Sequence, residues 1–212
     1  MNTLDSFEKP LVYLITDGTA KSENFNEKKR KILNLIEIAV ETKISLIQIR
    51  EKQLSARLVF ELTAEAAKIA RDSRTKILVN DRADIALAAN ASGVHLTSAS
   101  LSAAVIKQNF PKDFIVGVSV HSIEEAKTAR LQAADFITFS PVFASPGKGK
   151  PQGIDELREI CKQLNPFPVI ALGGVDETNY AETLEAGASG FAAIRFLNDE
   201  ENLRKLAAGL HN

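Results

Sequence analysis

Short apolar runs rich in β-forming residues recur about every 20 to 35 residues along this chain, with helix-length segments between most of them. Several of these runs, such as LVYLI, KILV and PVIAL, are continuously apolar and do not alternate with polar residues. Continuous apolar runs are typical of parallel strands that helices cover. The pattern therefore predicts repeated β–α units around a parallel sheet.

Eight such strands are expected, at Leu11–Asp17, Ile44–Arg50, Lys76–Asn80, Gly93–Leu96, Phe114–Val120, Phe136–Val142, Pro168–Gly174 and Gly190–Arg195. Eight β–α units favour closure into a single (β/α)8 TIM barrel of the α/β class, and an open doubly wound sheet is the alternative. No linker or change of composition suggests a second domain. Residues 1–212 are therefore expected to form one TIM-barrel domain, with residues 1–10 as an N-terminal extension.

The segments between the strands carry helix signals. Alanine and leucine recur at three- and four-residue spacing in Leu58–Arg71, and Ser55 is a suitable N-cap for that helix. Ser122 can cap a later helix, and Glu125, three residues further on, would complete a capping box. Further helices are expected at Leu157–Leu164 and Glu201–Leu210.

Composition excludes several classes of function. The formal net charge of −1 at pH 7 gives no bulk attraction to nucleic acid or to an anionic membrane. The single cysteine, Cys161, excludes an internal disulfide framework and is expected to be a buried structural thiol in a reducing compartment. The N-terminal residues show no signal sequence, and no apolar run approaches the ~20 residues that a membrane span needs. We expect a cytoplasmic protein.

Polar residues follow most of the predicted strands, which in a TIM barrel is where active sites lie. Arg50, Lys52, Lys148 and Arg195 are expected to converge on one mouth of the barrel. A concave site lined by cations suits a polyanion, and guanidinium groups can bind phosphate oxygens bidentately. Alternatively, Arg50 and Lys52 are surface charges beyond the end of a strand.

Two glycines, Gly173 and Gly174, follow the seventh predicted strand. Glycines at this place let backbone N–H groups approach a phosphate, although a tight β–α turn alone would also explain them. The connection Phe143–Gly153 is long and rich in Gly, Pro and Lys, a composition that in a surface loop favours a functional role.

Asp81, after the third strand, is a candidate ligand for Mg²⁺, which often combines one or two carboxylates with substrate oxygens. It could instead be the N-cap of a helix at Arg82–Ala89. His121 could donate or accept a proton near neutral pH, or simply form a hydrogen bond at a helix entry. His95 is flanked by Val94 and Leu96 and is expected to pack or position. The three histidines lack the spacing of a zinc site.

Eight segments together resemble thiamin phosphate synthase and its sister family, the thiazole tautomerases: YLITD, IQIREK, ILVNDRADIALA, GVHL, VGVSVHS, AADFITFSPVF, PVIALGG and GASGFAAI. They run in order from Leu11 to about Leu197. The resemblance implies a transferase of thiamin biosynthesis that joins an aminopyrimidine diphosphate to a thiazole phosphate and releases pyrophosphate. It further implies that the pyrimidine–diphosphate bond breaks first, leaving a carbocation that the thiazole nitrogen captures, with Mg²⁺ at the diphosphate. A homodimer is also implied.

The resemblance carries roles to individual residues. Gln48 matches the pyrimidine-side glutamine, and Asn80 and Asp81 match an Asn-Asp pair whose aspartate binds Mg²⁺. Gly173 and Gly174 match the glycines at the thiazole phosphate. The groups matched to the diphosphate end are Arg50, Lys52, Ser119 and Lys148, and together with His121 they are the expected catalytic residues.

Three positions depart from the synthase pattern. Ser100 stands where a second Mg²⁺-binding aspartate is usual, so the metal should bind more weakly. The loop after the sixth strand keeps one hydroxyl at Ser145 and loses another at Gly147. Arg195 replaces a serine, and it could bind the thiazole phosphate more strongly or fill that pocket.

These departures leave alternatives open. One is a thiazole tautomerase-like enzyme that uses His121 as its acid and base, since tautomerases need no diphosphate leaving group. The other is a barrel that binds thiamin precursors without turnover. Small phosphorylated molecules are the expected partners in every case.

Overall fold

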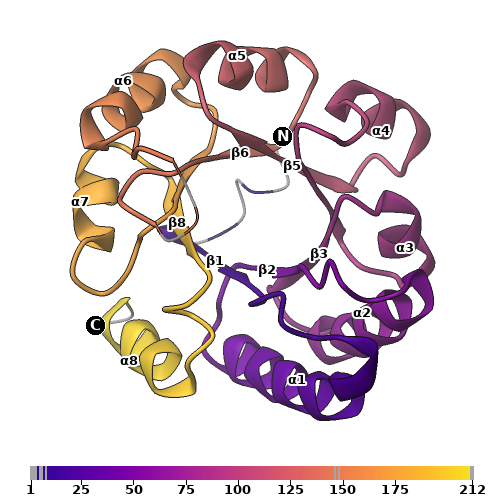
Figure 1. Ribbon diagram of the computed structural model, residues 1–212. Coiled ribbons are helices and arrows are strands. Elements are labelled where there is room, and N and C mark those ends of the chain that lie inside the picture. Colours follow the sequence, from indigo (N-terminus) through magenta and orange to yellow (C-terminus); the bar gives the residue numbers. More distant parts are fainter. Residues whose placement is uncertain (1–3, 5–6, 8, 146, 148, 211–212) are drawn as a thin grey trace. The chain divides into compact units, whose positions relative to one another are not determined.

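The computed structural model describes residues 4, 7, 9–145, 147 and 149–210, so Lys148 lies outside the described residues. Eight parallel strands form a closed barrel in the order β1 to β8 (Figure 1). They are β1 Leu11–Ile15, β2 Leu46–Ile49, β3 Lys76–Asn80, β4 Gly93–Leu96, β5 Ile115–Val120, β6 Phe136–Phe139, β7 Val169–Leu172 and β8 Gly190–Ala193. The predicted (β/α)8 barrel is confirmed, and the doubly wound alternative is wrong because the sheet closes.

Each strand is followed by a helix. The helices are α1 Phe25–Glu41, α2 Ala56–Ala70, α3 Ala83–Ala88, α4 Ala103–Asn109, α5 Ile123–Leu131, α6 Ile154–Leu164, α7 Tyr180–Glu185 and α8 Glu200–Leu210, and a short 3-10 helix, η2, spans Ser22–Asn24 before α1. β3 and β4 have the predicted bounds. Five other strands end one to three residues before their predicted ends, because the polar and glycine residues there belong to the turns that follow.

The chain divides into two compact units. The first comprises Met1–Val12 and His95–Ala193, and the second comprises Tyr13–Val94 and Ile194–Asn212. Among their largest fully buried side chains are Phe136, Phe139 and Phe191 in the first unit and Tyr13 and Ile47 in the second. The expectation of a single domain stays a prediction.

Strand register within each unit brings specific side chains next to one another. In the first unit β5 pairs with β6, and Ser119 is opposite Thr138. In the second unit β1 pairs with β2, and Ile15 is opposite Gln48. Helix α8 lies beside α1 in this second unit, so the end of the chain packs against its first helix (Figure 1).

Ser55 and Ser122 are both N-cap residues, as predicted, but they form only some of the expected capping hydrogen bonds. Ser55 is the N-cap residue of α2, but its side chain makes no capping hydrogen bond. The Ser122 side chain does cap α5, since it accepts from the Glu125 N–H at 3.2 Å. The Glu125 carboxylate, however, accepts from the backbone of His121 and not from Ser122, so the predicted capping box is incomplete.

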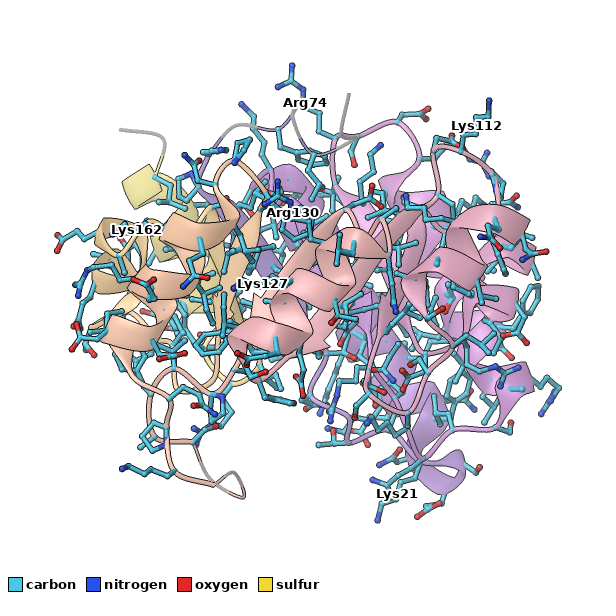
Figure 2. All side chains as sticks on the ribbon, turned by 90° about the horizontal axis from the view of Figure 1, so that it is seen from above. Lys21, Arg74, Lys112, Lys127, Arg130 and Lys162 are labelled. Atoms are coloured by element: carbon cyan, nitrogen blue, oxygen red, sulfur yellow. The ribbon has the colours of Figure 1, made fainter. Side chains whose placement is uncertain are left out.

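Cations on the outer helices serve the scaffold. Arg130 of α5 donates from Nη1 to the carbonyl of Leu164, the last residue of α6, at 3.4 Å. A cation at a helix C-terminus satisfies carbonyls that have no partner inside the helix. Lys127 and Lys162 are exposed on α5 and α6 (Figure 2).

Cys161 lies on α6 and is buried, as predicted. Burial raises the pKa of its thiol to about 11, so the reactive thiolate is scarce near neutral pH. Within the described part of the chain, no helix has both the length and the apolar character to cross a bilayer. The cytoplasmic location stays a prediction.

Candidate active site

Predicted site residues of the second unit line a cavity of about 200 Å³ beyond the ends of β2 and β3. Lys52, Asn80 and Asp81 are among its walls, together with Ile49, Glu51, Leu54, Ala56, Val59 and Arg82. The cavity therefore brings an ammonium group, an amide and a carboxylate to one concave surface. An anion with a bound metal cation could place its negative charge beside the ammonium group and its cation beside the carboxylate.

Asp81 has an unusual backbone. Its φ of 59° is in the left-handed region, which aspartate tolerates better than most residues and which is frequent at functional sites. Asn80 Nδ2 donates to Asp81 Oδ2 at 2.6 Å and so orients the carboxylate. The N-cap residue of α3 is Arg82, not Asp81 as in the capping alternative, and Arg82 forms a bidentate pair with Asp84.

Gln48 is buried at the centre of β2. Its Nε2 donates to the phenolic oxygen of Tyr13 at 3.0 Å, and both side chains are almost fully buried. Burial raises the pKa of the Tyr13 hydroxyl, so the group is neutral at physiological pH. This bond holds the Gln48 amide in one orientation. No local pattern indicated the Tyr13 contact, because the partners are 35 residues apart.

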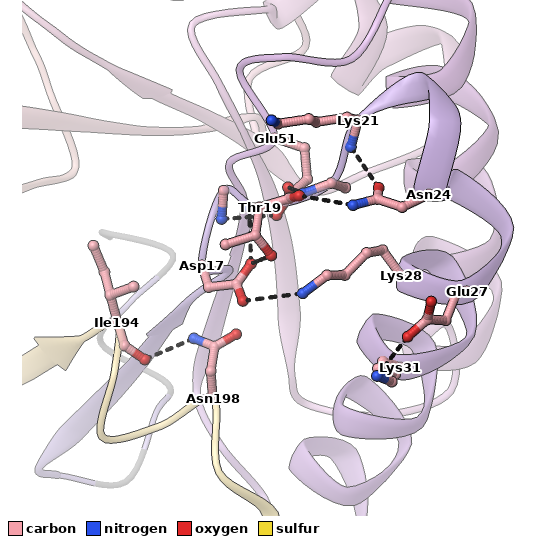
Figure 3. Close-up of polar contacts among 12 residues, drawn as sticks. Asp17, Thr19, Lys21, Asn24, Glu27, Lys28, Lys31, Glu51, Ile194 and Asn198 are labelled. Carbon is pink, nitrogen blue, oxygen red and sulfur yellow. Dashed lines mark hydrogen bonds and ion pairs between the residues drawn. The ribbon is translucent and has the colours of Figure 1, made fainter.

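Glu51 connects the end of β2 to the loop after β1 (Figure 3). Its Oε1 accepts from the Gly18 N–H at 3.2 Å and its Oε2 from the Ala20 N–H at 2.9 Å. The side chain is only 3% exposed, and burial raises the pKa of its carboxyl, an effect that hydrogen bonds from Thr16, Ala20 and Gly18 oppose. The sequence signal for this anchoring role was the charged Glu51 within the segment IQIREK, at the end of the second predicted strand.

Arg50 and Lys52 flank this anchor. The Arg50 N–H donates to the Thr16 hydroxyl at 2.8 Å, so the backbone that carries Arg50 is tied to the end of β1. Arg50 is half-buried, whereas Lys52 is exposed at the cavity. The two interpretations of Arg50 and Lys52, as phosphate-binding cations or as surface charges, both stay predictions.

Arg195 is exposed in the turn that follows β8. Asn198 anchors this turn by donating to the carbonyls of Ile15 and Ile194, both at 2.7 Å (Figure 3). Asp17 lies in the loop after β1. Its carboxylate accepts from the Thr19 hydroxyl at 2.7 Å and pairs with the Lys28 ammonium group at 3.8 Å. Asn198 was not predicted, and nothing in its local sequence distinguishes it.

In the first unit, Ser119 belongs to a cluster of polar side chains on the neighbouring strands β4, β5 and β6. His95 Nε2 lies 2.9 Å from Ser119 Oγ and 3.3 Å from Thr138 Oγ1, and the Thr138 hydroxyl donates to Ser119 Oγ at 3.4 Å. His95 and Thr138 are buried, and Ser119 is half-buried. His95 thus has a positioning contact, as predicted. Thr138 was missed because it lies within the apolar run FITF.

His121 follows β5 and is exposed. Its Nδ1 lies 2.6 Å from the carbonyl oxygen of Ser140. A carbonyl only accepts, so Nδ1 carries the proton, and in the neutral ring Nε2 is then the acceptor. This is the protonation pattern of a histidine that can act as a base.

Gly173 and Gly174 support the loop after β6. Their φ values are 94° and 68°, and a Cβ atom at Gly174 would lie 2.5 Å from the Ala144 carbonyl oxygen. The Phe143 N–H donates to the Gly173 carbonyl at 2.9 Å. The glycines therefore have a packing role in addition to the phosphate role predicted for them. Ser145 of this loop is half-buried, and Gly147 is exposed.

Ser100 closes the turn after β4. Its Oγ accepts from the Thr97 N–H at 2.8 Å and lies 3.3 Å from the Thr97 hydroxyl. Ser100 is thus held in the turn by its hydroxyl. This hydroxyl is neutral, whereas the synthase pattern has a carboxylate at the same position. In the part of the chain that the structure describes, no group of three or more His, Cys, Asp or Glu side chains is placed to hold a metal ion.

Comparisons with known proteins identify the family of this chain. A putative thiamine-phosphate synthase of Geobacter sulfurreducens is 39% identical over 202 residues, which cover 94% of this chain and 92% of the relative. A thiamine-phosphate synthase of Caldanaerobacter subterraneus is 37% identical over 175 residues, 81% of each chain. The solved thiamine phosphate pyrophosphorylase of Pyrococcus furiosus has a TM-score of 0.79 at 28% identity and covers 96% of this chain and 98% of its own. Residues 12–197 match the family model described as thiamine monophosphate synthase, and the chain therefore belongs to that family.

Proposed function

We propose that this protein is a thiamin phosphate synthase, a transferase that joins aminopyrimidine diphosphate to thiazole phosphate and releases pyrophosphate. The observation that carries the proposal is the cavity lined by Lys52, Asn80 and Asp81 in a chain of this family. A cation beside an oriented carboxylate is the donor set that a metal-bound diphosphate requires.

In the proposed reaction, the bond between the pyrimidine methylene carbon and the diphosphate oxygen breaks, and its electron pair leaves with pyrophosphate. The thiazole nitrogen then donates its lone pair to the carbocation to form the new C–N bond. The protein's contribution is to orient both partners and to stabilise the departing charge. Arg50 and Lys52 would bind diphosphate oxygens, with Ser119 and Lys148 as further donors, and Gln48 would orient the pyrimidine.

Asp81 is the proposed protein ligand for Mg²⁺. Its carboxylate is a hard oxygen donor of the kind Mg²⁺ prefers, and Asn80 holds it in place at 2.6 Å. When bound, the metal supplies positive charge against the leaving diphosphate. The neutral Ser100 adds no charge, so we propose a Mg²⁺ site weaker than one built from two carboxylates. Substrate oxygens and water would complete the coordination.

A second candidate function rests on His121. Because Nδ1 donates to the Ser140 carbonyl, Nε2 is positioned as a base, which a thiazole tautomerase-like enzyme would need. A barrel that binds thiamin precursors without turnover is the third. Small phosphorylated molecules are the proposed partners of all three. The homodimer stays a prediction.

Pyrophosphate release separates these functions. Purified protein is incubated with aminopyrimidine diphosphate, thiazole phosphate and Mg²⁺, and both pyrophosphate and thiamin phosphate are measured. A synthase forms both in equal amounts, only when the thiazole is present. Isomerisation of the thiazole without the diphosphate substrate identifies a tautomerase, and tight binding with neither reaction identifies a binding barrel.

Two variants that each remove one positive charge test where the diphosphate binds. Lys52→Ala removes a cation at the cavity and should lower kcat/KM by roughly 10²-fold, the size of effect seen when an oriented donor to a transition-state charge is lost. Lys127→Ala removes an exposed cation on α5 and should leave kcat/KM unchanged. Equal losses in both variants would contradict the placement of the diphosphate at Lys52.

A further inference from the structure

The cluster of His95, Ser119 and Thr138 contains one hydrogen bond, between His95 and Ser119, whose donor depends on the position of one proton. All three side chains lie on neighbouring strands of the first unit, and the register places Ser119 opposite Thr138. The Thr138 hydroxyl donates to Ser119 Oγ, so that proton is assigned. The 2.9 Å contact between His95 Nε2 and Ser119 Oγ has two possible directions, depending on which ring nitrogen of His95 carries the proton.

The two directions give Ser119 opposite properties. If Nε2 is protonated, the Ser119 oxygen accepts from both His95 and Thr138, and its own O–H points outside the cluster as a donor. If Nε2 is bare, the Ser119 proton is directed to His95, and the serine is an activated nucleophile with no donor for an anion. Diphosphate oxygens only accept hydrogen bonds, so only the first arrangement serves an anionic substrate.

We propose that His95 is a positioning residue that, as its Nε2–H tautomer, holds the Ser119 hydroxyl as a hydrogen-bond donor for an anionic oxygen of the substrate. The inference rests on the proposed function for the identity of that oxygen, which belongs to the diphosphate. It adds a specific role for His95 and Thr138. Together they saturate the acceptor capacity of Ser119 and leave its proton for the ligand.

Packing keeps the His95 ring in this orientation. The side chain is 2% exposed and lies 5.8 Å, centroid to centroid, from the Phe136 ring. Gly117 permits the arrangement, because a Cβ atom there would lie 2.8 Å from His95 Nδ1 and 2.3 Å from Phe136 Cζ. A ring enclosed in this way cannot exchange its two nitrogens by rotation without moving its neighbours. The packing therefore keeps Nε2, and not Nδ1, beside Ser119.

The tautomer can be measured directly. Nitrogen-15 chemical shifts of labelled histidine distinguish a protonated from a bare ring nitrogen, and the chain has only three histidines to assign. His121→Gln and His211→Gln variants identify the His95 signals by elimination, without altering the cluster. We expect a protonated Nε2 at neutral pH, before and after addition of inorganic pyrophosphate. A bare Nε2 would overturn the proposal and favour a nucleophilic serine.

Binding of inorganic pyrophosphate with Mg²⁺, measured by calorimetry, tests the coupling. Ser119→Ala should weaken binding about tenfold or more, equal to ~1.4 kcal/mol. His95→Phe keeps a ring but loses the Nε2 donor, and it should weaken binding similarly, whereas His95→Gln returns an N–H near that position and should restore part of the loss. The His95→Phe, Ser119→Ala double variant should bind no worse than Ser119→Ala alone. Additive losses would overturn the proposal.

Thr138 provides a second route if the His95→Phe variant fails to fold. Thr138→Val keeps the side-chain shape and removes the donor to Ser119, while Thr138→Ser retains it. Only Thr138→Val should weaken pyrophosphate binding, and equal behaviour of the two variants would count against the cluster. A protonated Nε2 with coupled pyrophosphate binding but without synthase turnover would refute the proposed function and leave this inference intact.

Discussion

Gln48 Nε2 donates a hydrogen bond to the hydroxyl of Tyr13 at 3.0 Å, between two side chains that are almost completely buried. A buried amide can rotate by half a turn and exchange its donor for its acceptor, so a fixed partner determines which atom faces a ligand. Tyr13 therefore holds the Gln48 amide, whose oxygen would, in the proposed synthase, accept from an amino group of the pyrimidine.

Tyr13→Phe tests this relationship. Loss of the acceptor leaves a buried Gln48 N–H without its partner, which should lower the free energy of unfolding by about 1–3 kcal/mol. The KM for aminopyrimidine diphosphate should rise while the KM for thiazole phosphate stays unchanged. Urea unfolding and steady-state kinetics measure the two effects. The control is Tyr180→Phe, which keeps the ring that contacts Phe191 and should change stability by less than about 0.5 kcal/mol.

Asp81→Asn tests the proposed metal ligand. Asparagine keeps the shape, tolerates the left-handed backbone and can still accept from Asn80, so the change removes only the charge. The Mg²⁺ concentration for half-maximal activity should rise strongly. Asp84→Asn removes an exposed carboxylate that pairs with Arg82, and its Mg²⁺ requirement should equal that of the wild type. Unchanged Mg²⁺ dependence in Asp81→Asn would assign Asp81 a structural role.

Ser100→Asp should act in the opposite direction. Aspartate can accept from the Thr97 N–H as serine does, and it adds the carboxylate that the synthase pattern has at this position. The Mg²⁺ concentration for half-maximal activity should therefore fall below that of the wild type. Ser98→Asp, on an exposed residue of the same turn, is the control for added charge. Equal effects of both substitutions would indicate a general electrostatic effect and no ligand position.

Glu51→Gln has a pH-dependent effect on stability. Burial raises the pKa of Glu51 above the ordinary value of 4.5, so the folded state keeps a proton that the unfolded chain has already released. The stabilisation from this proton is complete below the ordinary pKa and is lost as the pH rises through the raised value. The stability advantage of the wild type over Glu51→Gln should therefore narrow as the pH rises from 4.5.

At neutral pH some advantage should remain, about 1–3 kcal/mol, because the glutamine NH₂ faces backbone N–H groups that the carboxylate accepts from. Chemical denaturation at several pH values measures the gap. Glu37→Gln, on an exposed position of α1, is the control for the same substitution at the surface. A gap that widens with rising pH for Glu51→Gln would mean that the folded-state pKa is lowered.

Gly174→Ala should destabilise the protein by about 1–3 kcal/mol, because the backbone has a φ of 68° and the new Cβ would meet the Ala144 carbonyl oxygen at 2.5 Å. Thermal and urea unfolding measure the loss. Gly209→Ala is the matched control. It lies in α8 with no atom near its Cβ position, and alanine should stabilise that helix by up to about 1 kcal/mol.

The sequence by itself was enough to predict the barrel. Apolar runs and helix periodicity are local patterns, and a run such as KILVN at β3 was assigned with its observed bounds. Strand ends were predicted less well, above all at β6, because a residue such as Val142 can continue a strand or begin a turn. The backbone hydrogen bonds of the neighbouring strand decide between the two.

Tertiary structure decided which polar groups meet. Tyr13 and Gln48, Glu51 and Ala20, and the cluster of His95, Ser119 and Thr138 join residues 19 to 43 positions apart. Their pairing depends on strand register and on the turn geometry of each loop, neither of which a local pattern contains. The sequence showed which residues end the strands. Burial and register determined which of these side chains meet, and the proposed recognition of an anion depends on the direction of the hydrogen bonds between them.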